Sequence, residues 1–321
     1  MVRIGYTLST EEHGPRELIA QAKQAEQAGF AALWISDHFH PWLDVQGHSP
    51  FVWSVIGAIG EVTSLPIATS ITCPIMRIHP AIIAQAAATS GALARGGFAL
   101  GVGTGEALNE HIFGDPWPPA AKRRAMLEEA VALMRELWDG GLVTRDGEFF
   151  TVENARLYTL PDRPPPVYVS AFGPKSAETA GRIGDGLVTM GPDPEVIKIF
   201  RESGGAGKPI QGGFKASVGD DAEEAAAYAR ERWPNDALPG EVGQLLPLPR
   251  HYQQLTDELI TPERLRKMMP CGPDPEEHLA ALRPYIEAGV DDVFVNQVGK
   301  RQDQFFEFYA EKILPQVARM G

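Results

Sequence analysis

The sequence of 321 residues has only two cysteines, Cys73 and Cys271, which lie far apart and belong to no CxxC or CxxxH motif. This scarcity excludes a disulfide framework and a cysteine-rich zinc site, and it predicts two buried, reduced thiols. Basic residues are also few, since 29 Lys and Arg stand against 42 Asp and Glu, a formal net charge of −13. So acidic a chain repels nucleic acid and anionic membranes, and we predict neither as a partner.

Long hydrophobic runs are absent as well. No stretch approaches the ~18 consecutive apolar residues that a membrane-spanning helix needs. The first residues, MVRIGYTLS, turn polar at once and offer no apolar segment followed by a cleavage site, so we expect no export signal. The predicted location is therefore the cytoplasm, and the predicted partner is a small-molecule substrate.

What the sequence does contain is a regular alternation of apolar runs of strand length with amphipathic stretches of helical period. The predicted strands are residues 2–8, 31–35, 67–71, 98–102, 167–171, 186–190, 210–218 and 292–296. The predicted helices are residues 15–28, 51–62, 80–95, 121–138, 176–183, 221–233 and 302–317. Some eight strands, all but the one at 186–190 followed by a predicted helix, indicate a closed (β/α)₈ barrel, that is, an α/β TIM barrel.

An open doubly wound sheet is the alternative to the barrel. It is disfavoured because no GxGxxG fingerprint follows the first strand, where Gly5 runs on into Tyr6, Thr7 and Leu8. Two stretches, 139–166 and 235–273, interrupt the alternation, and the second is expected to hold a short helix at 261–269. We interpret both as insertions in a single domain that covers residues 1–321.

The carboxyl ends of the strands form the active face of such a barrel, so the residues that follow each strand are the first candidates for a site. They include three acids, a histidine pair, an indole and two glycine-containing segments. The candidates are Glu11, Asp37, His38, His40, Trp42, Ser70, Ile71, Glu106, Asn109, Ser170, Ala171, Phe172 and Gly173. Together they suit acid/base chemistry on a flat aromatic ligand.

Within this set, Asp37 and His38 form the most specific pair, because imidazole accepts a proton near neutral pH and a neighbouring carboxylate can orient it. His40 follows two residues later, so an HxH metal site is an alternative, but no second paired spacing of histidines supplies further ligands. We therefore predict no metal. Glu106 lies between Gly105 and Ala107 in a loop where backbone can approach a ligand closely, and its carboxyl group is able to exchange a proton.

Several segments together resemble a known family. They are SDHFHPW (36–42), GHSPF (47–51), IHPAIIAQAAAT (78–89), LGVGTGEALNE (100–110) and AGRIGDGL (180–187). The sequence resembles the luciferase-like oxidoreductases that use the deazaflavin coenzyme F420, and most closely the F420-dependent glucose-6-phosphate dehydrogenases. The resemblance covers nearly the whole chain. It implies a (β/α)₈ barrel, a homodimer, and coenzyme F420 bound at the carboxyl ends of the strands, with FMN less favoured.

The resemblance also implies roles for individual residues. His38 would take the proton of a substrate hydroxyl while the carbon passes hydride to C5 of the coenzyme, Glu106 would exchange a proton with its ring, and Trp42 would line the reacting centre. The coenzyme would be held by Asp37, Ser70, Ile71, Asn109, Ser170, Ala171, Phe172 and Gly173. Glu11 matches a further active-site carboxylate, and the peptide bond between Ser70 and Ile71 would be cis.

Departures from the family pattern gather at the substrate. Where the sugar-phosphate enzymes carry a threonine and a lysine that bind phosphate, this chain has Met190, Gly191, Pro192 and Asp193. An aspartate there repels a phosphate dianion, so the expected substrate is not glucose 6-phosphate. His40 replaces a glutamine and would contact the substrate together with Glu11 and Met190. Cys73 replaces a threonine, and Phe172 a glycine.

The sequence therefore predicts an F420-dependent oxidoreductase that acts on an alcohol or sugar carbon, or on the corresponding carbonyl. Three alternatives stay open. The first is an FMN- or F420-dependent reductase of an imine or enone, in which His38 contacts the substrate. The second is a metal-dependent barrel hydrolase built on His38 and His40, and the third is a coenzyme-binding module without activity.

Overall fold

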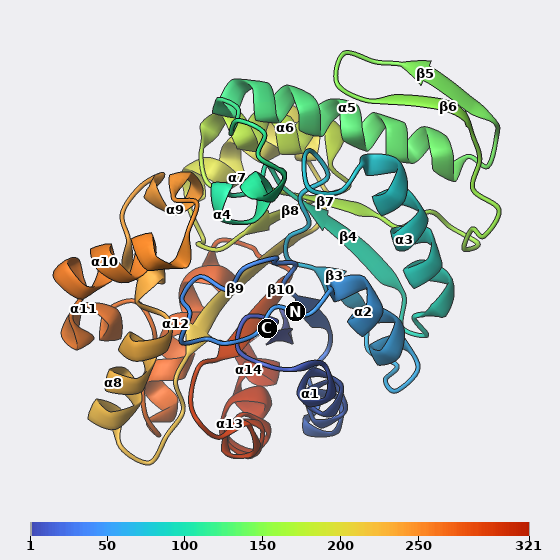
Figure 1. The fold of residues 1–321 in the computed structure, drawn as a ribbon. Helices are drawn as coiled ribbons and strands as arrows, with labels where there is room; N and C mark the ends of the chain where they lie inside the picture. The colour runs from blue at the N-terminus through green and yellow to red at the C-terminus, as the bar shows by residue number, and fades with distance from the viewer. Residues whose placement is uncertain (1, 321) are drawn as a thin grey trace.

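The eight barrel strands are β1 (Arg3–Leu8), β2 (Leu33–Ile35), β3 (Ile67–Thr69), β4 (Phe98–Val102), β7 (Val167–Ser170), β8 (Gly186–Thr189), β9 (Ile210–Ala216) and β10 (Asp292–Gln297). In this computed structural model, which describes residues 2–320, they are parallel and close in the order β1-β10-β9-β8-β7-β4-β3-β2 (Figure 1). The closing pair joins Arg3 to Asp292, with their Cα atoms in register. The predicted (β/α)₈ barrel is confirmed, and the open sheet is excluded.

Helices pack around this barrel. They are α1 (Pro15–Ala28), α2 (Val52–Gly60), α3 (Pro80–Leu93), α5 (Ala120–Trp138), α6 (Pro174–Ile183), α7 (Pro194–Phe200), α8 (Ala222–Arg232), α12 (Pro275–Glu287), α13 (Gln302–Phe308) and α14 (Leu314–Met320). Helix α1 shows how the sequence sets such bounds. Glu17 accepts a hydrogen bond from the Gly14 N–H ahead of Pro15, and Gly29 ends the helix at φ 91°.

Three helical predictions need correction. Residues 194–200 and 275–287 form α7 and α12, where the sequence predicted no helix. Helix α12 carries Pro284 in its interior, which breaks the expected pattern, although Asp274 caps its start by accepting from the Glu276 N–H. The predicted helix 302–317 is divided into α13 and α14 by a π-helical turn, Tyr309–Ile313.

Two stacked aromatic rings lie at the centre of the barrel interior. Trp34 and Phe294 lie 4.1 Å apart between ring centroids, with an interplanar angle of 6°. Glycines make room for them, since a Cβ on Gly5 would lie 2.3 Å from the Phe294 ring and one on Gly213 would lie 2.7 Å from Trp34. The Trp34 indole N–H donates to Gln211 at 3.0 Å. A packed barrel leaves its mouth, at the carboxyl ends of the strands, as the place for a site.

The first predicted insertion contains an antiparallel hairpin of β5 (Val143–Asp146) and β6 (Thr151–Ala155), beside α5 at the outer edge of the molecule (Figure 1). Its turn is anchored by Glu129 of α5, whose carboxylate accepts from the Phe149 and Phe150 N–H groups. The sequence predicted an insertion here but no strands.

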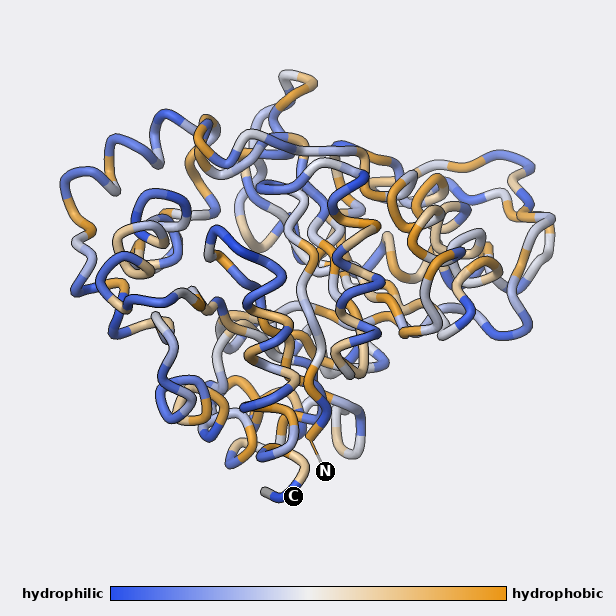
Figure 2. Tube along the Cα trace, turned by 90° about the horizontal axis from the view of Figure 1, so that it is seen from below, coloured by the Kyte–Doolittle hydropathy of each residue, from blue (hydrophilic) through white to orange (hydrophobic). Residues whose placement is uncertain are grey.

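The second predicted insertion, 235–273, is more helical than expected. It contains α9 (Val242–Leu245), α10 (Pro249–Leu259) and α11 (Pro262–Arg266), of which only α11 was predicted. Residues Pro234–Ala237 add a turn of 3₁₀ helix. These segments flank one side of the barrel in Figure 1, while Figure 2 shows the two chain ends together at one end of the barrel.

Candidate functional site

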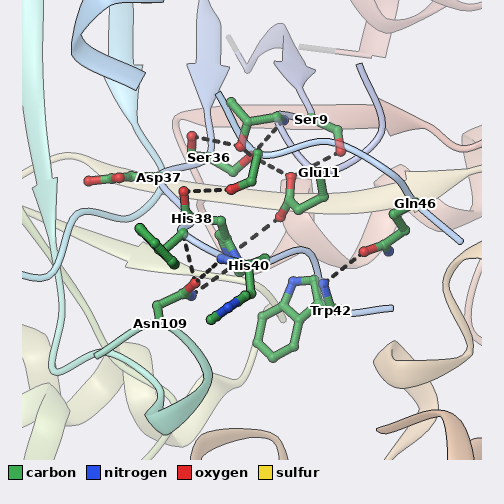
Figure 3. A network of polar contacts seen from close by, with 12 residues as sticks. Ser9, Glu11, Ser36, Asp37, His38, His40, Trp42, Gln46 and Asn109 are labelled. Atoms are coloured by element: carbon green, nitrogen blue, oxygen red, sulfur yellow. Dashed lines mark hydrogen bonds and ion pairs between the residues drawn. The ribbon is translucent and has the colours of Figure 1, made fainter. Parts of the chain in front are cut away.

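The loop that follows β2 carries the central group of the site, His38 (Figure 3). Its Nε2 lies 3.4 Å from Oε1 of Glu11, which follows β1. Its Nδ1 lies 3.1 Å from Asn109 Nδ2 and also 3.1 Å from the carbonyl oxygen of His40. When Nδ1 carries the ring hydrogen it can donate to the His40 carbonyl, and Nε2 is then free to accept a proton; when Nδ1 accepts from Asn109, Nε2 carries the hydrogen and faces Glu11.

Glu11 is prepared to face a positive charge. Its side chain is buried, and it accepts hydrogen bonds from Ser9 Oγ at 3.0 Å and Ser36 Oγ at 2.6 Å. Burial alone would raise the pKa of Glu11, but the charge of His38 and the bond from Ser36 outweigh it, so the pKa lies below its ordinary value. Glu11 is therefore a carboxylate in the neutral range, directed at Nε2 of His38.

Asn109 fixes the other side of the imidazole. Its Oδ1 accepts from the backbone N–H groups of Phe39 at 2.8 Å and His40 at 3.1 Å, which leaves its Nδ2 on His38. Asn109 belongs to α4 (Ala107–Glu110), a single helical turn after β4, and is 2% exposed. Its side chain therefore binds the loop after β2 rather than facing the barrel mouth.

The two aromatic neighbours of His38 complete this loop. The ring centroid of Trp42 lies 5.1 Å from that of His38, and the indole packs edge-on against Tyr252 of α10 at 5.3 Å. Gln46 Oε1 accepts from the Trp42 backbone N–H at 2.9 Å. His40 is turned toward α4, where its Nδ1 lies 3.0 Å from the Leu108 carbonyl oxygen.

Asp37 lies under the loop, 4% exposed. It accepts from Thr72 Oγ1 at 2.9 Å and from the guanidinium of Arg77 at 2.8 Å. Arg77 also contacts Glu110, through Nε at 3.4 Å and through its backbone N–H at 2.7 Å. Burial raises the pKa of Glu110 to about 7, although Arg77 opposes the shift.

Tight packing shapes the segments after β3 and β4. The peptide bond between Ser70 and Ile71 is cis, as the resemblance implied. Gly105 has φ +70°, and a Cβ there would lie 2.5 Å from Cys73 Sγ, so only glycine fits. Glu106 follows it, partly buried and without a capping bond to α4. Glycine at 105 thus decides where the Glu106 carboxyl group is presented.

The remaining candidates lie at the ends of β7 and β8. Phe172 is 63% exposed and Met190 is 38% exposed, and with Phe39, 50% exposed, they give this end of the barrel a partly apolar lining. Gly173 lies just before α6, at its N-cap, and provides no side-chain cap for the first N–H groups of the helix. The candidates near His38 thus form one connected cluster. The others lie at the next two strand ends: Ser170 ends β7 and is followed by Ala171, Phe172 and Gly173, while Met190 follows β8.

Three side chains of the site were not singled out by the sequence: Arg77, Glu110 and Lys215. Lys215 precedes the last residue of β9, and its ammonium lies 2.7 Å from Asp236 Oδ2 and 4.1 Å from the Trp233 ring centroid. Lys215 lies inside β9 (Ile210–Ala216), so a search among the residues that follow each strand does not reach it. Arg77 and Glu110 gave no signal either, because they act through loop contacts.

Within residues 2–320, no cluster of three or more His, Cys, Asp or Glu side chains is arranged to hold a metal ion. His38 and His40 each have a ring nitrogen beside a backbone carbonyl oxygen. Cys73 and Cys271 are free and buried, as the sequence predicted. Among the described helices, none is both long and apolar enough to span a membrane.

Comparison with known proteins agrees with this geometry. The profile of the luciferase-like monooxygenase family matches residues 1–292. A protein of Beutenbergia cavernae described as an F420-dependent glucose-6-phosphate dehydrogenase is 37% identical over 329 residues, 99% of this chain and 98% of that protein. One of Kribbella flavida with the same description is 37% identical over 333 residues, 100% of this chain and 99% of its own.

Solved structures give the same result. An F420-dependent secondary alcohol dehydrogenase, in complex with an F420–acetone adduct, superimposes with a TM-score of 0.90 at 33% identity, covering 98% of each chain. The F420-dependent tetrahydromethanopterin reductase of Methanopyrus kandleri shares the fold, with a TM-score of 0.78 at 18% identity over 98% of this chain and 99% of that one. The chain belongs to the luciferase-like family. Within it, the chain is a relative of the F420-dependent dehydrogenases.

Proposed function

We propose that this protein is an F420-dependent dehydrogenase that oxidises an alcohol or sugar carbon without a phosphate group, or reduces the corresponding carbonyl. The observation that carries the proposal is the placement of His38, with Nε2 on the Glu11 side and both a donor and an acceptor at Nδ1. Oxidation of an alcohol needs a base for the hydroxyl proton next to a hydride acceptor. The full-length relatives described as F420-dependent support F420 as the hydride acceptor.

The residues present suit this coenzyme. The exposed side chains of Phe39, Phe172 and Met190 offer apolar surface to a flat ring system. The free N–H groups at the start of α6, where Gly173 provides no side-chain cap, suit an anionic tail. Ser70, Ile71, Ser170 and Ala171 would line the ring. When bound, the deazaflavin supplies a hydride acceptor at C5.

The chain itself manages the proton. His38 Nε2 would accept the hydroxyl proton, and the resulting imidazolium would be stabilised by Glu11 at Nε2 and by the His40 carbonyl at Nδ1. Trp42 would shield the reacting centre from water, and Glu106 would exchange a proton with the coenzyme ring. Asp37 and Asn109, both enclosed, would act on the coenzyme through the loops that they hold in place.

A substrate without phosphate is supported by the charges near the barrel mouth. Asp193, where the sugar-phosphate enzymes have a cation, is exposed, and its carboxylate caps α7 through the Glu195 and Val196 N–H groups. Lys215 is already paired with Asp236. Arg266, in the second insertion, contacts Glu223 and Glu277 instead of the mouth. A phosphate dianion would therefore meet more negative than positive charge.

We propose that the protein forms a homodimer in the cytoplasm. Helices α2 and α3 contain no Asp, Glu, Lys or Arg, yet Ile82 is 56% and Leu93 41% exposed, and Phe51 just before α2 is 57% exposed. An apolar hollow of about 280 Å³ lies between the helices. Because a chain with net charge −13 repels its own copies, an uncharged face is where a second copy can dock.

The test is the visible spectrum of oxidised F420 mixed with the purified protein. Bleaching is expected when a secondary alcohol such as 2-propanol, or a free sugar, is added, and no bleaching with glucose 6-phosphate. Bleaching with glucose 6-phosphate alone would refute the substrate proposal. Failure to bind F420 would refute the coenzyme proposal, and oxidation of bound reduced FMN by an imine or enone would favour the alternative reductase.

A further inference from the structure

One buried arginine joins three loops beneath the site. Arg77 lies between β3 and α3, and its side chain is 6% exposed. Its guanidinium lies 2.8 Å from Asp37 Oδ1 after β2 and 3.4 Å from Glu110 Oε1 at the end of α4. Its backbone N–H donates to Glu110 Oε2 at 2.7 Å. Arg77 is thus bonded to both loops that carry the His38 environment.

The two carboxylates that Arg77 holds are neighbours in sequence of the two groups that meet in the site. Asp37 directly precedes His38, and Glu110 directly follows Asn109. Asn109 and His38 are 71 residues apart in the chain, and their 3.1 Å contact requires α4 to lie at a fixed distance from the loop after β2. The same fixed distance supports the bonds from the Phe39 and His40 N–H groups to Asn109 Oδ1.

We propose that Arg77 is a positioning residue for His38: by bridging Asp37 and Glu110 it locks α4 against the loop after β2. Asn109 is thereby kept beside His38 Nδ1 and on the N–H group of His40, whose carbonyl accepts from Nδ1. The proposal deepens the proposed function, because it rests on His38 as the proton acceptor. A guanidinium fits the task because its planar fork binds two acceptors in fixed directions, whereas an ammonium is a point charge.

The bridge carries an excess of negative charge, since Asp37 and Glu110 share one arginine. The charged and titratable groups around Glu110 are Arg77 and Asp37 from neighbouring loops, Cys73 after β3, and Glu106 from its own loop. Burial raises the pKa of Glu110 to about 7, so protonation below that pH leaves Arg77 with one ionised partner. The contact between α4 and the loop after β2 is therefore expected to loosen as pH falls through about 7.

The first experiment compares R77M with R135M. Arg135 also contacts a carboxylate, Asp185 at 2.9 Å, but it lies on the exposed side of α5 and serves as the matched control. With oxidised F420 and 2-propanol, R77M is expected to lose about 10- to 100-fold in kcat while KM changes within about twofold, because misplacement affects the transition state more than binding. R77K is expected to recover only part of the loss, and R135M to behave as wild type.

A second readout needs neither coenzyme nor substrate. In protein labelled with ¹⁵N-histidine, the His38 ring resonances are expected to shift in R77M and to stay unchanged in R135M, because Nδ1 loses its fixed partner. In the wild type, the side-chain amide signals of Asn109 are expected to move with a midpoint near pH 7. That movement should be absent in E110Q, which keeps the size of Glu110 and removes its titration.

The proposal is overturned if folded R77M keeps the wild-type kcat and His38 spectrum. If R77M does not fold, it is overturned when the Asn109 signals of the wild type fail to respond to Glu110 titration. Since the spectra are recorded without F420, these results stay distinct from a failure of the proposed dehydrogenase activity, which would leave the spectral shifts intact and abolish only turnover.

Discussion

His38 Nε2 lies 3.4 Å from Glu11 Oε1, and the two side chains are only 10% and 4% exposed. Such an enclosed pair favours one protonation state of the histidine over the other. The carboxylate is the better hydrogen-bond partner once the ring is protonated, so the pair favours the state in which His38 has accepted a proton. Ser9 and Ser36 complete the arrangement by holding the Glu11 carboxylate on the far side.

Replacing His38 by Ala is expected to lower kcat by about 10² to 10⁴, because general-base catalysis is lost. Binding of oxidised F420 should survive, since the exposed apolar side chains and the start of α6 are untouched. Stopped-flow bleaching of F420 gives kcat, and quenching of coenzyme fluorescence gives Kd. A variant with unchanged kcat would show that another group accepts the proton.

Changing Glu11 to Gln keeps the shape of the side chain and removes its charge. The imidazolium then loses a charge-assisted hydrogen bond of ~1.5–3 kcal/mol, so kcat should fall about 10- to 100-fold. Ser9→Ala, which removes only one neutral donor to the same carboxylate, is the control and should cost less. Equal losses in both variants would mean that the charge of Glu11 does not matter.

The lowered pKa of Glu11 also makes a stability prediction. Its folded pKa is below the unfolded one, so it contributes stability above the ordinary carboxyl pKa, and that contribution is lost as pH falls through the folded pKa. In urea titrations, E11Q should therefore show a smaller loss of unfolding free energy on acidification than the wild type. A parallel pair of curves would contradict this.

Glu12 behaves in the opposite way. Its Oε2 is buried without a hydrogen-bond partner among residues 2–320, and burial raises its pKa to about 8. Between about pH 4.5 and 8 the folded chain keeps this proton and the unfolded chain releases it, so stability falls by about 1.4 kcal/mol per pH unit. E12Q should be more stable than the wild type at pH 8.5 and similar at pH 4. Melting temperatures at both pH values test this.

Pairing between Lys215 and Asp236 is expected to exclude anions from the mouth. Asp236→Asn releases this lysine, so inhibition of alcohol oxidation by glucose 6-phosphate or inorganic phosphate should strengthen, by about tenfold for one freed charge in a partly enclosed site. D257N, which breaks the surface pair with Arg230, is the matched control. No change in the inhibition constant of D236N would place Lys215 outside the reach of anionic ligands.

The proposed dimer predicts that Ile82→Arg yields monomers. A charge placed on the uncharged face of α2 and α3 would lose its hydration on association, and in a symmetric dimer the loss occurs twice. Light scattering coupled to size-exclusion chromatography measures the mass directly. L142R, at a position 66% exposed outside that face, should leave the mass of the wild type unchanged. A wild type that is monomeric at micromolar concentration would refute the dimer.

Periodicity predicted the barrel well, because parallel strands enclosed by helices are continuous apolar runs that few other structures produce. It failed for the β5–β6 hairpin, where Val143 and Val152 are the only buried residues of two short strands. It failed for α12 because Pro284 interrupts a helix that tertiary packing sustains: His278, Leu279, Leu282 and Tyr285 are buried along it.

For the site, too, some features could be predicted from the sequence and others could not. The types of side chain at the strand ends, and the likeness of SDHFHPW and GVGTGE to the F420-dependent enzymes, were determined by the sequence alone. Tertiary structure decided the partners: Glu11 at Nε2, Asn109 and the His40 carbonyl at Nδ1, and Arg77 beneath Asp37. Barrel closure brings together loops that are tens of residues apart, and hydrogen bonds form only within a few tenths of an ångström, so no pattern along the chain encodes them.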